Sequence, residues 1–106
     1  MISPLSQYTH LTHLNLSNNR IAVIENLERL TLLTHLDLSL NEITIIPSAI
    51  QANKHIHELL LSDNRIASID DMVSLRNLSN LMILDIKDNP VALAPECIPF
   101  IRTILP

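Results

Sequence analysis

Apolar positions along this chain follow two different periods that alternate. The pattern L-x-x-L-x-L-x-x-N-x-I, with Ile or Val replacing some leucines and isoleucines, recurs four times. The copies begin at residues 11, 33, 56 and 81 and are therefore 22, 23 and 25 residues apart. The L-x-L core of each copy has period two, which predicts a short strand with its leucines pointing inward. Repetition at this interval predicts a solenoid of stacked coils.

Between the copies the apolar spacing changes to three residues. Ile24, Leu27 and Leu30 have this spacing after the first copy, and the run 69–81 has it after the third. A period of three predicts short 3₁₀ or helical turns on the outer side of the solenoid. The second copy is followed instead by the polar stretch 51–55. We therefore expect the outer side of that coil to be more irregular.

The ninth position of every copy is asparagine. Its amide both donates and accepts hydrogen bonds, so it can pair backbone groups that are left free where the chain turns away from the strand. Glycine is absent from the sequence, and we expect asparagine to take the left-handed backbone positions that turns require. Stacked copies would align a ladder of Asn19, Asn41, Asn64 and Asn89.

The whole chain, 1–106, is predicted to form a single domain, because this length allows one domain at most. Residues 1–10 are expected to form an N-terminal partial repeat or cap, since Ile2, Leu5 and Tyr8 continue the three-residue spacing backwards. Residues 92–106 are expected to form the C-terminal cap.

The C-terminal cap is predicted to contain a helix from about Pro95 to Ile104. Such a helix would place Cys97, Ile101 and Ile104 on one face, where they can cover the last repeat. Phe100 is expected to contribute to the same cover.

These features resemble the short, 22-residue class of leucine-rich repeats, typified by the nuclear regulatory subunit of protein phosphatase 1. The C-terminal segment NPVALAPECIPFIRTILP resembles a cap found in ciliary or axonemal proteins, the spliceosomal A-prime protein and acidic nuclear phosphoproteins. In the family the cap usually continues into one more strand, so the cap at 92–106 is expected to be truncated. The resemblance implies an α/β fold: a right-handed solenoid with a short parallel sheet on its concave face and 3₁₀ or short helical turns on its convex face.

The residues between the strand leucines are predicted to point outward and to align in columns across the concave face. One column would hold His13, His35, Glu58 and Ile83, the next Asn15, Asp37, Leu60 and Asp85, and a third Ser17, Ser39, Ser62 and Lys87. Beyond the third column would run Asn18, Leu40, Asp63 and Asp88.

Three large apolar residues on this predicted face, Leu40, Leu60 and Ile83, are surrounded by acidic side chains. Clustered exposed apolar residues ringed by carboxylates favour an interface with a basic, amphipathic partner segment. Isolated surface leucines are also common, so an incidental surface is the alternative.

Residue types with catalytic or metal-binding chemistry occur on the same face. His13 and His35, with Asp37 and Glu58 nearby, could in principle hold a metal, but ordinary solvated side chains explain them better. Serine, histidine and aspartate also coexist there, yet a gently curved sheet provides no water-excluding pocket or oxyanion site. A phosphate-binding loop rich in glycine is impossible in this sequence. We therefore expect no enzyme activity, no metal and no cofactor.

Charge and cysteine usage restrict the partner and the compartment. The formal net charge of −4 and a pI near 5.6 argue against direct nucleic-acid binding. A single cysteine, Cys97, cannot form an internal disulfide, and no stretch has the length and apolarity of a signal or membrane segment. An intracellular location, cytoplasmic or nuclear, is expected.

The predicted function is non-catalytic recognition of a partner protein by the concave face. The resemblance implies a scaffold or regulatory subunit of a ciliary, cytoskeletal or nuclear assembly. The alternative is a ribonucleoprotein subunit that holds an RNA-binding partner protein, as the spliceosomal A-prime protein does. The oligomeric state and the choice between cilium and nucleus stay open.

Overall fold

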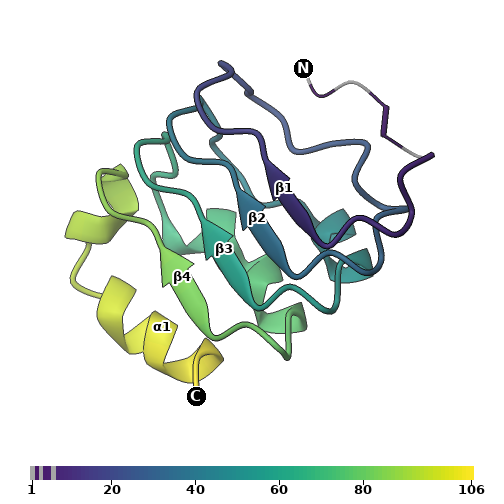
Figure 1. Ribbon diagram of the computed structural model, residues 1–106. Helices are drawn as coiled ribbons and strands as arrows, with labels where there is room; N and C mark the ends of the chain where they lie inside the picture. Colours follow the sequence, from purple (N-terminus) through teal and green to yellow (C-terminus); the bar gives the residue numbers. More distant parts are fainter. Residues whose placement is uncertain (1, 3, 6) are drawn as a thin grey trace.

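Four short strands lie side by side in one parallel sheet, in the order of the chain (Figure 1). The computed structural model describes residue 2, residues 4–5 and residues 7–106, so residues 1, 3 and 6 of the expected N-terminal cap lie outside the described residues. The strands are β1 (His13–Asn15), β2 (His35–Asp37), β3 (Glu58–Leu60) and β4 (Ile83–Asp85). Parallel neighbours need a crossover between them, and here each crossover is one coil around a shared core. The predicted solenoid with a parallel sheet is confirmed.

The core beneath the sheet is aliphatic and continuous from coil to coil. The central strand leucines of the two inner coils, Leu36 and Leu59, are fully buried, whereas Leu14 and Leu84 in the outer strands are only partly buried. This difference follows from stacking, because an inner coil is covered on both sides and an end coil on one side. Each coil thus depends on its neighbours to bury its apolar side.

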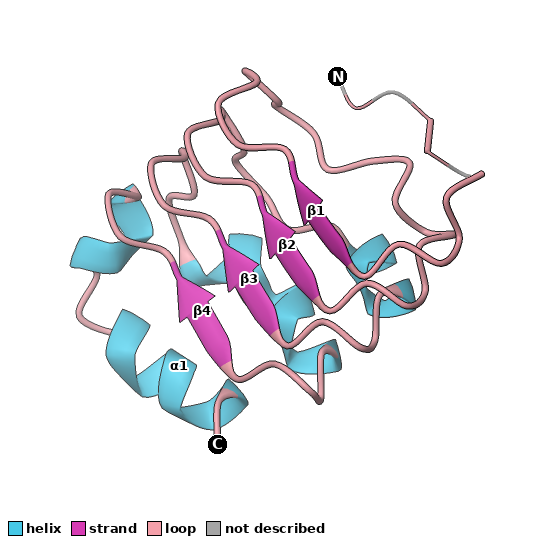
Figure 2. Ribbon diagram, viewed as in Figure 1, coloured by secondary structure: helices cyan, strands magenta, loops and turns pink. Residues whose placement is uncertain are grey.

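Three short 3₁₀ helices occur in the described residues. Those at 48–52 and 69–77 lie behind the sheet, and that at 90–93 lies beside β4 (Figure 2). They are η1 (Ser48–Ala52), η2 (Ile69–Asn77) and η3 (Pro90–Leu93). The first coil has turns instead, in which the Leu30 amide donates to the Leu27 carbonyl at 3.0 Å and the Leu33 amide to the Leu30 carbonyl at 3.2 Å. Such bonds, three residues apart, are the physical counterpart of the three-residue apolar spacing.

The expectation of an irregular outer side in the second coil is wrong, because η1 lies there. Pro47 precedes the helix with φ of −73°, and Ile50 is buried against the core. Asn53, from the polar stretch, turns inward and is 1% exposed. Its amide nitrogen donates to the carbonyls of Leu27 at 2.8 Å and Leu30 at 3.1 Å. An inward asparagine therefore ties this helical coil to the turns of the coil before it.

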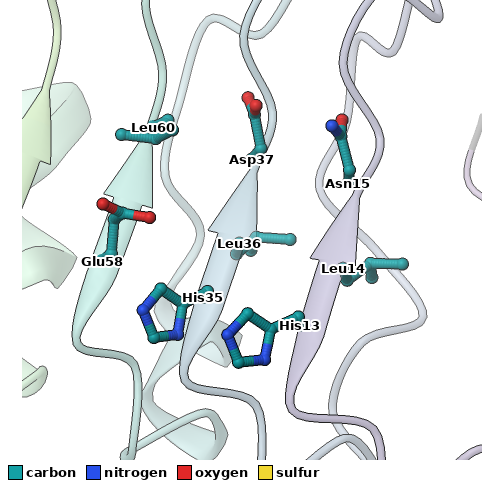
Figure 3. Close-up of a pocket in the computed structure, with 8 residues that line it drawn as sticks. All are labelled: His13, Leu14, Asn15, His35, Leu36, Asp37, Glu58 and Leu60. Carbon is teal, nitrogen blue, oxygen red and sulfur yellow. The ribbon is translucent and has the colours of Figure 1, made fainter.

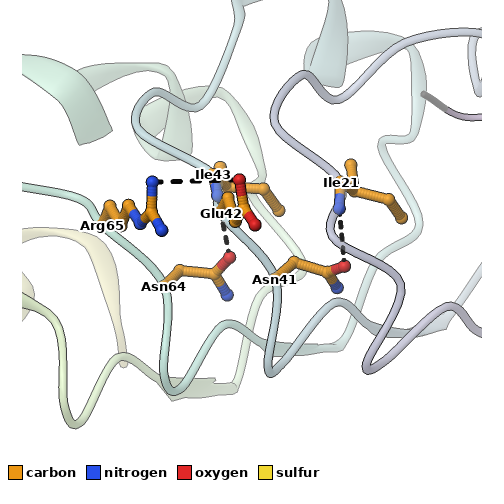
Figure 4. A network of polar contacts seen from close by, with 6 residues as sticks. All are labelled: Ile21, Asn41, Glu42, Ile43, Asn64 and Arg65. Carbon is orange, nitrogen blue, oxygen red and sulfur yellow. Dashed lines mark hydrogen bonds and ion pairs between the residues drawn. The ribbon is translucent and has the colours of Figure 1, made fainter.

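Asn41 and Asn64 of the predicted ladder accept the amides of Ile21 and Ile43 in the preceding coils (Figure 4). The amide nitrogen of Asn64 donates to the Leu61 carbonyl of its own coil at 3.0 Å and to the Leu38 carbonyl of the preceding coil at 2.9 Å. Its side-chain oxygen accepts the Ile43 amide at 2.9 Å. Asn19, in the first coil, is exposed, and its amide nitrogen donates to the carbonyls of Leu16 and Ser17 in its own coil.

The last coil ends this ladder with a proline. In the third coil the residue after the ladder asparagine, Arg65, donates its amide to the Ile43 carbonyl at 2.8 Å. The equivalent residue of the fourth coil is Pro90, which has no amide hydrogen. The Val91 amide takes that place and donates to the Ile66 carbonyl at 2.9 Å. The Val91 amide is thus paired although no further coil offers it an asparagine.

Left-handed backbone positions are not reserved for asparagine, contrary to the expectation. Asn18 and Asn26 adopt positive φ as expected, but side chains of other types occupy the rest, and every ladder asparagine has negative φ. The other positive-φ residues are Arg20, Leu40, Asp63 and Asp88.

The C-terminal helix α1 (Cys97–Ile104) packs against η2 and η3 and covers the last coil. Cys97 and Phe100 are buried, while Ile101 and Ile104 are only partly buried. Phe100 is therefore a principal covering residue rather than a secondary one, and the Arg76 guanidinium lies 5.3 Å from the centre of its ring. Within the described part of the chain, no helix has the length and apolarity needed to cross a bilayer.

Replacing Asn64 with alanine should lower the free energy of unfolding by about 1–3 kcal/mol, because the Leu38 carbonyl and the Ile43 amide lose their partner in the interior. The matched control, Asn19→Ala, removes bonds at an exposed position and should cost less than about 1 kcal/mol. Urea unfolding followed by circular dichroism measures both values. Equal losses in the two variants would contradict the proposed role of the shared amide.

Docking of α1 should also be visible in the pH dependence of stability. Burial raises the pKa of the Cys97 thiol, and the carboxylate of Glu96 adds to the effect. The unfolded chain then loses its thiol proton at a lower pH than the folded chain. The stability from this group is complete below the ordinary cysteine pKa of about 8.5 and is lost as pH rises through the higher folded value.

We therefore expect the free energy of unfolding to decline above about pH 8.5 more steeply in the native chain than in Cys97→Ala. Denaturant titrations of both proteins across the alkaline range measure the difference. Parallel curves would show that the thiol is not desolvated and that α1 does not cover it.

Candidate functional site

The strand register assembles the columns expected on the concave face. Cα partners align His13 with His35, His35 with Glu58, and Glu58 with Ile83. The second column follows from the same register and holds Asn15, Asp37, Leu60 and Asp85. Neighbouring strands of a sheet lie about 4.8 Å apart, so side chains in one column are close enough to act on one ligand together.

A hollow of about 280 Å³ lies over the first three strands (Figure 3). Leu14 and Leu36 line it from below, and polar side chains stand around it. These polar side chains are His13, His35, Asn15, Asp37 and Glu58, with Leu60 at one side. The hollow therefore offers both apolar contact and acidic hydrogen-bond acceptors.

The histidines of the first column form a stack. The rings of His13 and His35 are nearly parallel, at 7°, with centres 4.2 Å apart, and the ring of His57 lies 6.1 Å from that of His35. The hydroxyls of Thr12 and Thr34 lie 3.0 and 2.8 Å from the Nδ1 atoms of the following histidines. Sequence reasoning missed these threonines, although the repeated Thr-His pair was the available signal.

Thr34 joins the histidine stack to the neighbouring strand. Its hydroxyl oxygen lies 3.1 Å from the Thr12 carbonyl and 2.8 Å from Nδ1 of His35. Among the residues that the structure describes, no three metal-ligating side chains gather as a metal site.

Hydrogen bonds from serines orient the second column. The amide and hydroxyl of Ser39 donate to Oδ1 of Asp37 at 3.0 and 2.6 Å, and those of Ser17 donate to Oδ1 of Asn15 at 2.9 and 2.7 Å. These serine hydroxyls are thus engaged by the second column rather than by the histidines. The same arrangement with an aspartate and with an asparagine shows that the turn needs an acceptor and not a charge.

The carboxylates of the concave face have no cationic partner within ion-pair distance in the described residues. In the described residues an ion pair joins Arg65 and Glu42 at 3.8 Å, and these two residues do not belong to the columns. Asp37 and Glu58 are half-buried on neighbouring strands. Their negative charge is therefore available to a ligand.

Two of the outward positions differ from the prediction. Ser62, placed in the third outward column, is buried, whereas the equivalent Ser17 and Ser39 are half-buried. Leu60 lies on the concave side but is half-buried. Leu40 and Ile83 are exposed as predicted, at 54% and 47%.

A second, shallower depression lies where the chain enters the strands. Leu32, His55, His57 and Asn80 line it together with the two threonines that contact the histidine stack. Its lining contains no carboxylate. Negative charge is thus concentrated toward the middle of the concave face rather than along this edge.

Comparison with known proteins agrees with this architecture. Residues 9–51 match the family described as Leucine Rich repeats (2 copies). No curated protein sequence matches the chain.

Three solved structures illustrate the structural likeness. Internalin C2 of Listeria monocytogenes shares 28% identity over 91% of this chain and 41% of its own, with a TM-score of 0.75. The internalin InlF of the same organism shares 31% identity over 84% of this chain and 25% of its own, with a TM-score of 0.70. A chain of the Drosophila melanogaster SNF/U2A' complex shares 21% identity over 84% of this chain and 65% of its own, with a TM-score of 0.71.

This chain spans less than two thirds of each of those structures. The repeated pattern, the parallel sheet and these matches lead to one conclusion about the fold. The chain has the fold of a leucine-rich repeat solenoid.

Proposed function

We propose that the concave face binds a basic, amphipathic segment of a partner protein and that the chain acts without catalysis. Leucine-rich repeat domains generally serve as protein-interaction modules. The observation that carries the proposal is the set of unpaired carboxylates beside apolar side chains on one rigid face. Asp37, Glu58 and Asp85 supply the charge, and Leu60 and Ile83 supply the apolar contact.

The physical basis is complementarity on a pre-formed surface. Lysine and arginine side chains combine an apolar stem with a charged end, so they can cover leucine while reaching a carboxylate. The strand register and the serine bonds already hold the second column in place, and a rigid surface loses little conformational entropy on binding. Carboxylates without internal partners also attract a basic segment before contact.

The cellular role that we propose is a scaffold or regulatory subunit of an intracellular assembly, ciliary, cytoskeletal or nuclear. Support comes from the spacing of the repeats, which resembles the 22-residue class, and from the cap sequence that begins at Asn89. The free, buried thiol of Cys97 also fits a reducing compartment.

The alternative is a ribonucleoprotein subunit whose partner is itself an RNA-binding protein. The resemblance of the cap to the spliceosomal A-prime protein favours it, and the likeness to a chain of the SNF/U2A' complex concerns the fold alone. Titration of the purified chain with a recombinant RNA-recognition-motif domain distinguishes the two. Saturable binding that needs Asp37 and Glu58 would support this alternative over the first proposal.

The concave assignment can be tested by removing charge without disturbing the turns. Asp37→Asn, Glu58→Gln and Asp85→Asn, combined, keep the acceptors that Ser39 and Lys87 require, as Asn15 shows in the first coil. Random peptides displayed on phage are selected on the native chain. We expect the selected pool to be rich in lysine and arginine and to bind the variant about tenfold or more weakly.

The control variant carries the same charge change on the convex side, through Glu25→Gln, Glu28→Gln and Asp70→Asn. It should retain native affinity for the selected peptides, measured by fluorescence polarisation in low salt. Equal losses of affinity in both variants would show that net charge alone accounts for the binding. A peptide pool without enrichment in lysine and arginine would refute the proposal.

A further inference from the structure

We infer that Leu40 is a binding anchor that receives an apolar side chain of the partner segment. This inference rests on the proposed function and names one contact within it. The observation behind it is that a leucine occupies a backbone position that suits leucine poorly, while its side chain is 54% exposed.

Stacking of the coils imposes the left-handed conformation at this position. The equivalent residues of all four coils, directly before the ladder asparagines, have φ between 58° and 60°. In each of the first three coils the amide of this residue donates to a carbonyl of the next coil. For Leu40 the acceptor is the Ser62 carbonyl at 2.9 Å, and for Asp63 it is the Lys87 carbonyl at 3.0 Å. The side chain at this position therefore has no part in choosing the conformation.

The residue types in this column follow the backbone in every coil but one. Asn18, Asp63 and Asp88 are of the types that adopt left-handed φ most readily, because their short polar side chains can bond locally. Leucine has a bulkier side chain without that compensation, and its Cβ crowds the carbonyl in this region. Leu40 thus lowers the stability of its own turn.

Burial within the fold does not offset this cost. The side chain of Leu40 is more than half exposed, whereas Leu38, in the same coil, is fully buried. A residue of unfavourable type at a left-handed position, with more than half of its side chain exposed, fits a role outside folding. A large apolar side chain in that position fits contact with an apolar group of a partner.

The surroundings define the partner's chemistry. The residue at the same position of the next coil is Asp63. Asp37, which belongs to the second column of the concave face, precedes Leu40 by three residues in the sequence. A partner side chain that packs on Leu40 would therefore have basic neighbours in the partner sequence, and these basic side chains would pair with the two carboxylates. The expected ligand is a segment in which a large apolar residue lies among lysines and arginines.

Leu40→Asn separates the backbone from the side chain. It introduces a residue type that adopts left-handed φ readily, so we expect the melting temperature to rise by about 4 °C or more. The affinity for peptides selected on the native chain should fall about tenfold, because an apolar contact is lost. Leu40→Ala has no polar side chain that could bond locally in the left-handed conformation, so it should lose similar affinity without the increase in melting temperature.

Ile45→Asn is the matched control, because Ile45 is 49% exposed and is not a left-handed position. It should leave the peptide affinity unchanged and should not raise the melting temperature. Peptides selected afresh on Leu40→Asn should keep their basic residues but lose the enriched apolar position.

Each contrary result has a distinct meaning. Unchanged peptide affinity in Leu40→Asn, with basic enrichment intact, would overturn the anchor and leave the proposed function standing. A lower melting temperature in Leu40→Asn would overturn the backbone argument and the inference with it. A native pool without basic enrichment would remove the proposed function, and the anchor would fall together with it.

Discussion

The side-chain amide that two successive coils share is the interaction on which this structure depends. A solenoid turns its backbone sharply after every strand, and the groups exposed there would otherwise be buried without partners. Asn41 and Asn64 bond carbonyls of their own coil and of the coil before it, and their oxygens accept amides across the same junction. These bonds fix how each coil is aligned with its neighbour. The parallel register, and with it the face that carries the columns, follows from that alignment.

The first and fourth coils have contacts that differ from those of the inner coils. At the N-terminal end Asn19 bonds within its own coil and is exposed. At the C-terminal end Pro90 removes one donor, and α1 covers the last apolar coil through Cys97 and Phe100. Without such a cover the apolar side of the fourth coil would face water, since a repeat cannot bury that side alone. The helix α1 thus closes the apolar core beside the fourth coil.

Sequence periodicity was sufficient to predict the strands, their order and the residues of the first two columns, because both periods come directly from backbone geometry. It did not predict η1, since the inward turn of Asn53 depends on carbonyls of the preceding coil. The backbone conformation of Leu40 and the burial of Ser62 also depend on stacking. Ring stacking of His13 and His35 required side-chain orientations that a pattern of residues does not contain.

The reach of each ladder asparagine has a consequence for how the molecule can vary. Its bonds extend to the adjacent coil and no further, so energetic coupling runs between nearest neighbours along a line. Damage to one junction therefore stays local instead of spreading through the whole domain. The surface can be revised one coil at a time, with the remaining turns keeping their shape while selection explores new specificities.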